Sequence, residues 1–234
     1  MSPLTDDQRK AATVVGIAYL FAMAASMFTE GYVRSTLISA DAAATARNIA
    51  AHQSLFRASI GLELLTFVSD TTLIAALYVI LSPISRPLAL YATLLRMAGV
   101  AVGVMMAAHS FDVLRVLGTA PYLQAFDAGQ LAALARLGVG SHTSSYNVVF
   151  VFLGAGSTVS AMLWMASGYV PRPLAMLGVF ASVVLSVGTL AYLVVPELLR
   201  LMYPAYLVPM FFFEVGMGMW LLIKGLPPNR LSSR

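Results

Sequence analysis

Six apolar runs, each long enough to cross a lipid bilayer as a helix, dominate this sequence. One helical crossing needs about 20 apolar residues. Of the 234 residues, 59% are hydrophobic and only 10% are charged, whereas soluble domains carry about 25% charged residues. The sequence therefore predicts an all-α, polytopic transmembrane helix bundle. We expect the spans at about residues 11–30, 54–82, 88–112, 143–168, 174–195 and 204–224.

We expect residues 11–225 to form a single transmembrane helical domain between two cytoplasmic tails, residues 1–10 and 226–234. Two basic residues precede a first apolar run that contains Ala22-Met23-Ala24, which is similar to a signal peptide with its cleavage site. The run continues to about Thr29 and is long enough to span a bilayer. We therefore interpret it as a retained first helix.

Short connections that contain proline alternate with longer ones. Residues 82–87 and 168–173 each hold two prolines, and proline both ends a helix and restricts the residue before it. These segments are predicted to be tight helix–helix turns. The longer connections are predicted to form short amphipathic helices at the membrane surface. They are residues 40–53, with Ser39 or Asp41 as N-cap, and residues 121–137, with Asp127 as N-cap.

The basic residues are spread one or two at a time between the apolar runs, as topology signals are, and they form no patch for nucleic acid. Six spans place both termini on one side of the membrane. The basic residues of the short loops and tails favour cytoplasmic termini in the inner (plasma) membrane. We expect membrane lipids as partners and no nucleic acid, and the sequence does not determine the oligomeric state.

The third and fifth spans begin and end with similar sequences. Arg86-Pro87-Leu88-Ala89 opens the third span and Arg172-Pro173-Leu174-Ala175 opens the fifth; Asp112-Val113-Leu114-Arg115 and Glu197-Leu198-Leu199-Arg200 close them. This order suggests that spans 2–3 and 4–5 are a parallel repeat, as occurs in transporters. Convergence is the alternative, because such turns and helix ends are common.

Four ionisable residues lie inside the predicted spans: Glu63, Asp70, Arg96 and Glu214. A charge in hydrocarbon is costly, so such residues normally pair or face a wet cavity. Because the planar fork of arginine can bind two carboxylates, we predict that Arg96 pairs with Asp70 and Glu214. Glu63 is left without an obvious partner and is the candidate for proton coupling. The alternative is a static ionic lock that sets helix register.

Three acid–arginine pairs are expected at one mouth of the bundle, at spacings where helix neighbours meet. They are Glu30 with Arg34, Asp112 with Arg115, and Glu197 with Arg200. They would form either an interfacial belt or a polar gate.

All three histidines, His52, His109 and His142, fall on the same outer side. His109, Asp112 and His142 could together hold Zn²⁺ with an open position for water. The chain has no cysteine and no fixed metal-binding or nucleotide-binding spacing. We therefore predict no cofactor and keep this metal set as an alternative to hydrogen-bonding histidines at the interface.

Three hypotheses for the function follow. The first is binding or transport of a small amphiphilic or apolar molecule at the four buried ionisable residues, favoured by the aromatic and methionine residues around Glu214. The second is a structural or accessory membrane protein whose buried charges are locks. The third is an intramembrane enzyme that acts on a lipid-like substrate through a buried carboxylate or a metal.

Several segments carry a resemblance to a known family. They are Asp41-Ala-Ala-Ala-Thr-Ala-Arg-Asn-Ile, Ser54-Leu-Phe-Arg57, Ala125-Phe126-Asp127 with Gln130-Leu131, Pro171-Arg172-Pro173, and Trp220-Leu-Leu-Ile-Lys224-Gly225. The chain resembles, from about residue 11 to 225, the bacterial six-span membrane proteins catalogued as domain of unknown function 4386. The resemblance implies a single membrane domain. It implies no activity, so it assigns no catalytic residue.

Overall fold

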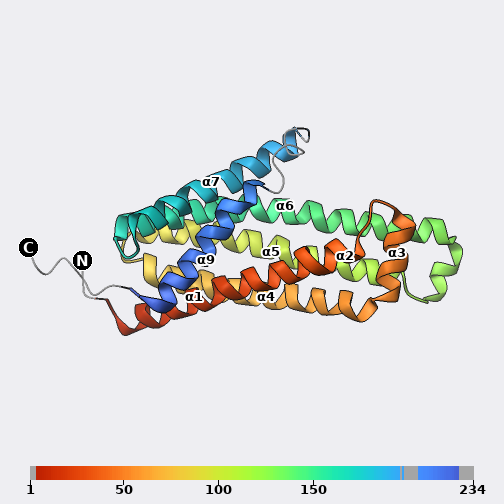
Figure 1. The fold of residues 1–234 in the computed structure, drawn as a ribbon, viewed down its shortest axis with the longest axis horizontal. Helices are drawn as coiled ribbons and strands as arrows, with labels where there is room; N and C mark the ends of the chain where they lie inside the picture. Colours follow the sequence, from red (N-terminus) through yellow and green to blue (C-terminus); the bar gives the residue numbers. More distant parts are fainter. Residues whose placement is uncertain (1–3, 196, 198–204, 227–234) are drawn as a thin grey trace, which may run out of the picture. The chain divides into compact units, whose positions relative to one another are not determined.

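The computed structural model describes residues 4–195, 197 and 205–226. These residues form helices and no strand, and six helical segments among them are long and apolar enough to span a membrane (Figure 1). The predicted all-α, six-span architecture is confirmed, and the chain is a multi-pass membrane protein. The spans are Asp6–Leu37, Gln53–Leu81, Arg86–Val116, Ala128–Ser167, Arg172–Val194 and Ala205–Ile223.

The first and last spans are each built from consecutive helices of different type. The first contains α1 (Asp6–Ser26), the π-helix η1 (Met27–Arg34) and α2 (Ser35–Leu37). The last contains the 3₁₀ helix η3 (Ala205–Leu207) and α9 (Val208–Ile223). The elements between them are α3 (Ala42–Ala51), α4 (Gln53–Leu81), α5 (Arg86–Val116), the 3₁₀ helix η2 (Pro121–Ala125), α6 (Ala128–Ser167) and α7 (Arg172–Val194).

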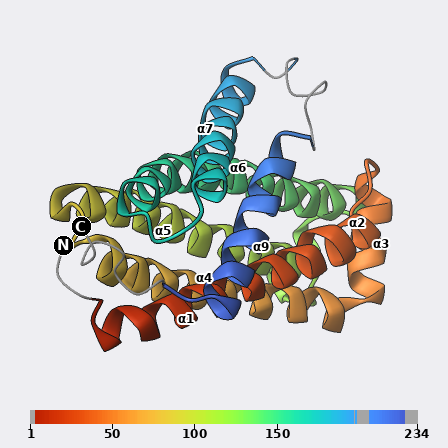
Figure 2. The ribbon, with the colours of Figure 1, turned by 60° about the vertical axis from the view of Figure 1, so that its left-hand side comes forward.

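The predicted short helix after the first span is α3, which lies beside α2 (Figure 2). Its N-cap is Asp41, whose carboxylate accepts the N–H groups of Ala43 at 3.2 Å and Ala44 at 3.0 Å. This cap satisfies two backbone donors that have no partner within the helix. Asp41 therefore begins the helix, rather than Ser39.

The prediction of a separate amphipathic helix over residues 121–137 is wrong. The 3₁₀ helix η2 forms over residues 121–125, and residues 128–137 are the first part of α6, which begins at Ala128 and continues for 40 residues. Asp127 and Gln130 form a capping box at its start, with each side chain accepting the other's backbone N–H at 2.8 and 3.0 Å. No proline interrupts residues 128–167, so the helix continues into the fourth span.

The two proline-bearing connections are tight turns, as predicted. Residues 82–85 join α4 to α5, and residues 168–171 join α6 to α7. Gly168 follows the end of α6 with φ +66°, a left-handed conformation that glycine adopts without steric cost. Pro171 then precedes α7.

The chain forms two compact units. Unit 1 comprises Met1–Met23, Ser69–Val100 and Asn147–Arg234, and unit 2 comprises Ala24–Val68 and Ala101–Tyr146. In unit 1, α7 packs against α9, and fully buried Trp164, Leu185 and Phe213 belong to the core. The core of unit 2 is smaller and includes Val33, Leu37, Ile49, Phe56, Ile60, Val113 and Val139.

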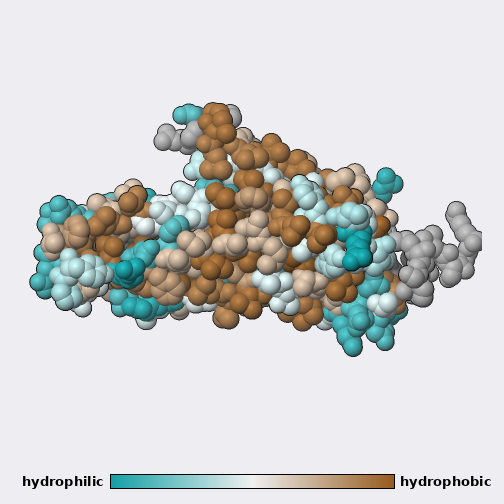
Figure 3. All heavy atoms as spheres, turned by 180° about the vertical axis from the view of Figure 1, so that it is seen from behind, coloured by the Kyte–Doolittle hydropathy of each residue, from teal (hydrophilic) through white to brown (hydrophobic). Residues whose placement is uncertain are grey.

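Large apolar side chains remain exposed along the helices of both units. Leu65 and Leu137 of unit 2 are 59% and 67% exposed, and Phe180 and Phe212 of unit 1 are 58% and 60% exposed. Hydrophobic residues cover much of the face drawn in Figure 3. Such surface is typical of helices that contact lipid rather than water.

The parallel repeat of spans 2–3 and 4–5 stays a prediction. Helices α4 and α5 contain 29 and 31 residues, whereas α6 and α7 contain 40 and 23. The single-domain organisation of residues 11–225 likewise stays a prediction.

Candidate functional site

Two carboxylates and an imidazole come together inside unit 2. Glu30 is supplied by the π-helix η1, Glu63 by α4 and His142 by α6. One oxygen or nitrogen atom from each side chain lies within 4.8 Å of the others. We call these three residues the carboxylate–histidine cluster.

The imidazole lies between the two acids. His142 Nε2 is 3.2 Å from Glu63 Oε1, a hydrogen-bond distance, and 4.0 Å from Glu30 Oε1. Arg34 Nε is 3.4 Å from Glu30 Oε2. Arg34 therefore holds one oxygen of Glu30 while the other oxygen faces the histidine.

The cluster is buried except at Glu30. The side chains of His142, Glu63 and Arg34 are 1%, 6% and 7% exposed, whereas that of Glu30 is 33% exposed. Glu30 is therefore the most exposed of these four residues.

The neighbours of the cluster on each helix explain why these polar groups point inward. Val33, Ile60 and Val139 are each at most 2% exposed and belong to the core of unit 2. Ile60 lies three residues before Glu63, and Val139 three residues before His142, so each pair shares one helix face. Packing the apolar residue in the core therefore turns its polar neighbour inward as well.

The prediction that Glu63 lacks a partner is wrong, since His142 of α6 pairs with it at 3.2 Å. The predicted alternative set of His109, Asp112 and His142 is not brought together either. His109 Nδ1 lies 3.3 Å from Ser145 Oγ, and Asp112 pairs with Arg115. The spacing of three residues between His109 and Asp112 could not reveal that Glu30 and Glu63 are nearer to His142.

Two of the three predicted acid–arginine pairs are confirmed. Arg34 pairs with Glu30 at 3.4 Å, and Arg115 with Asp112 at 3.0 Å on an exposed surface. In the third predicted pair, Glu197 is described and exposed, whereas Arg200 lies outside the described residues.

Arg96 in unit 1 is not the ion-pair hub that the sequence predicts. It is 4% exposed, and its Nη1 donates a hydrogen bond of 2.6 Å to Ser157 Oγ. In the described part of the chain neither the carboxylate of Asp70 nor that of Glu214 lies within 4.0 Å of it.

The reason for this difference is the close approach of α6. A Cβ atom added to Gly156 would lie 2.6 Å from Arg96 Cγ and 3.0 Å from the carbonyl oxygen of Ala92. The backbone of α6 therefore lies directly against the stem of Arg96, and the next residue, Ser157, meets the guanidinium.

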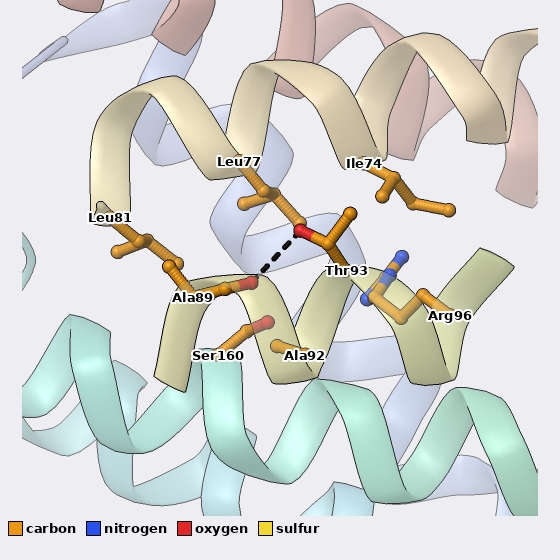
Figure 4. Close-up of a pocket in the computed structure, with 8 residues that line it drawn as sticks. All are labelled: Ile74, Leu77, Leu81, Ala89, Ala92, Thr93, Arg96 and Ser160. Carbon is orange, nitrogen blue, oxygen red and sulfur yellow. Dashed lines mark hydrogen bonds between the residues drawn. The ribbon is translucent and has the colours of Figure 1, made fainter. Parts of the chain in front are cut away.

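A small cavity borders Arg96 (Figure 4). It is lined by Arg96 and Ser160, by Thr93 and by apolar residues of α4 and α5. Its volume, taken as the space that the centre of a water molecule can occupy, is about 10 Å³. That space suits about one water. Pockets for drug-sized ligands have about 300–1,000 Å³.

The family described as Domain of unknown function (DUF4386) matches residues 14–225. No match was found among curated proteins or among solved structures.

Proposed function

The chain belongs to the family described as Domain of unknown function (DUF4386), and from this premise we propose that it is a membrane protein that binds a small cation at the carboxylate–histidine cluster. One observation carries the proposal: Glu30, Glu63 and His142 converge from three helices with donor atoms within 4.8 Å of one another. Carboxylate oxygens and a neutral imidazole nitrogen present lone pairs. Three such groups pointed at one position attract a positive ion.

The charge balance of the cluster supports a bound cation. Glu30 has Arg34 as its counter-ion, but among the residues that the structure describes no lysine or arginine lies within 4.0 Å of Glu63. An uncompensated carboxylate is costly in a low-dielectric interior. His142 neutralises the negative charge of Glu63 only as an imidazolium. A bound cation neutralises the charge of Glu63 while the imidazole ring of His142 is neutral.

A second candidate function is binding or transport of a small amphiphilic or apolar molecule at Asp70, Arg96 and Glu214, with Glu63 as the site of proton coupling. Arg96 supports this candidate because it borders a cavity. That cavity has room for about one water, so the function requires it to widen. Cation binding requires no such opening and is therefore the better supported proposal.

We also place the protein in the inner (plasma) membrane, with lipids against its exposed apolar side chains and both termini in the cytoplasm. The exposed residues of α4 and α7 support the lipid contact. The basic residues of the short loops support the orientation.

Thermal unfolding of the purified, tag-free protein in detergent tests the proposed function. Chloride salts of Na⁺, K⁺, Mg²⁺, Ca²⁺, Mn²⁺ and Zn²⁺ are compared at equal ionic strength. We expect at least one cation to raise the unfolding midpoint saturably, because a ligand at 100 times its Kd adds about 2.7 kcal/mol of stability.

The matched variants are Glu63→Gln, which should lose the response, and Asp112→Asn, which removes an exposed carboxylate outside the cluster and should keep it. Should Glu63→Gln fail to fold, the more exposed Glu30→Gln replaces it. A protein that no cation stabilises would support a purely structural role for the buried charges. A response that survives in the cluster variants would place the cation elsewhere.

A further inference from the structure

We infer that the cation is a divalent transition-metal ion of the Zn²⁺ class, held by Glu30, Glu63 and His142. This inference rests on the proposed function and names its ligand.

The donor set favours a transition metal over the common hard ions. Mg²⁺ and Ca²⁺ are bound through oxygen ligands, and the cluster places an imidazole nitrogen at its centre, between two carboxylates. Imidazole suits Zn²⁺, Cu²⁺, Fe²⁺ and Ni²⁺. Two carboxylates and one histidine are therefore better matched to Zn²⁺ or a similar ion than to Mg²⁺.

The spacing of the donor atoms suits a small ion. A tetrahedral ion with ligand distances of about 2.0–2.2 Å holds its ligand atoms about 3.3–3.6 Å apart. His142 Nε2 lies 3.2 Å from Glu63 Oε1 and 4.0 Å from Glu30 Oε1. Glu63 and His142 are nearly in place, and Glu30, the least buried member, completes the set by a small inward movement.

The unsatisfied atoms of the protein gather at this cluster. Eight buried side-chain nitrogen or oxygen atoms among the described residues have no hydrogen-bond partner, and four belong to the cluster and Arg34. They are Glu30 Oε1, Arg34 Nη2, Glu63 Oε2 and His142 Nδ1. Buried polar atoms normally have partners, and an ion or water is one way to provide them. Glu30 Oε1 is the oxygen that faces His142 Nε2, and Glu63 Oε2 is the second oxygen of the carboxylate that meets the histidine through Oε1.

The groups around the cluster resemble the outer shell of a metal site. Ligating carboxylates are usually held by a group outside the metal's own ligands, and Arg34 forms an ion pair with Glu30 Oε2 at 3.4 Å. The ring of Tyr146 stacks on that of His142, with centroids 6.3 Å apart and planes at 20°. Three protein ligands leave a fourth position open, and Glu30 belongs to a π-helix, a feature frequent at functional sites.

The experiment measures metal binding by the intact, tag-free protein in detergent, using equilibrium dialysis with Zn²⁺ and visible absorption with Co²⁺. We expect one Zn²⁺ per chain, which displaces bound Co²⁺ and is not itself displaced by excess Mg²⁺ or Ca²⁺. His142→Ala and Glu30→Gln should weaken Zn²⁺ binding by more than about 100-fold, beyond the loss for an outer-shell partner. Arg34→Met should weaken it by about 10- to 100-fold and alter the Co²⁺ spectrum.

His52→Ala is the matched control, because this histidine is exposed and its Nδ1 lies 3.1 Å from the carbonyl oxygen of Asn48, outside the cluster, and the variant should bind Zn²⁺ like the wild type. Unchanged Zn²⁺ affinity in the folded His142→Ala and Glu30→Gln variants would overturn the inference, as would equal binding of Mg²⁺ and Zn²⁺. If His142→Ala does not fold, the Zn²⁺ affinity of Glu30→Gln alone tests the inference. Stabilisation by Na⁺ or Mg²⁺ without Zn²⁺ binding would overturn the inference and leave the proposed function standing, whereas no cation effect would remove both.

Discussion

Glu63 and Arg96 are both buried charges, but their surroundings satisfy them in different ways. Glu63 meets His142, which can carry either charge state, and Glu30 lies beside the same ring. Arg96 carries a permanent charge and donates to the neutral hydroxyl of Ser157, while its Nε has no partner. We therefore assign a structural role to Arg96 in unit 1, whereas the group around Glu63 is the proposed cation site.

Replacing Arg96 by methionine tests this structural role. Arg96→Met removes a buried positive charge from unit 1, which also holds the buried carboxylate of Glu214 and the partly buried one of Asp70, and leaving a buried charge uncompensated costs about 3–5 kcal/mol. We expect a large fall in the unfolding free energy, measured by chemical denaturation in detergent. The exposed Arg115→Met should have little effect. Neutralising the acids as well, with Asp70→Asn and Glu214→Gln, should restore much of the loss; equal stability of Arg96→Met and wild type would contradict this role.

At the scale of the helices, small residues decide where backbones approach. A Cβ atom added to Gly154 of α6 would lie 2.7 Å from the backbone nitrogen of Ser186 and 2.8 Å from the carbonyl oxygen of Ser182, both in α7. Such contacts between small residues are the usual means of close helix packing in membranes. The α6–α7 contact of unit 1 therefore depends on the absence of a side chain at residue 154.

Gly154→Ala should destabilise the protein by about 1–3 kcal/mol, because the new methyl group meets backbone atoms that cannot rotate away. Gly61→Ala is the matched control, since no atom lies within 4 Å of a Cβ added there, and alanine favours helix over glycine by up to about 1 kcal/mol. Unfolding midpoints of the two variants should move in opposite directions. If both variants shifted the unfolding midpoint in the same direction and by the same amount, the close approach of α6 to α7 would not determine the stability of the protein.

At the scale of the whole molecule, six spans joined in series place the two ends of each helix on opposite sides of the membrane. Helix α5 is flanked by the short turn 82–85 and by the longer connection before α6. The orientation therefore rests on which of these two connections is cytoplasmic.

The chain has no cysteine, so single introduced cysteines report the orientation directly. We expect Gln124→Cys to react with a membrane-impermeant maleimide in intact cells, because the longer connection faces outward when the termini are cytoplasmic. Ser85→Cys should react only after the cells are permeabilised. The reverse labelling pattern would invert the proposed topology.

Several features of this protein follow from the sequence alone. The six spans follow from apolar runs of about 20 residues, the length that a helix needs to cross a bilayer. The cap at Asp41 and the ion pair of Glu30 with Arg34 depend on contacts within one or two turns of chain. Such local features need no knowledge of neighbouring helices.

Only the tertiary structure decided which distant residues meet. Glu63 pairs with His142, 79 residues away, and Arg96 with Ser157, 61 residues away. These contacts depend on how each helix is rotated and on where a glycine such as Gly156 lets two backbones approach. Charge and spacing along one helix do not specify that rotation, so the sequence identified buried charges but only the packing of the helices assigned their partners.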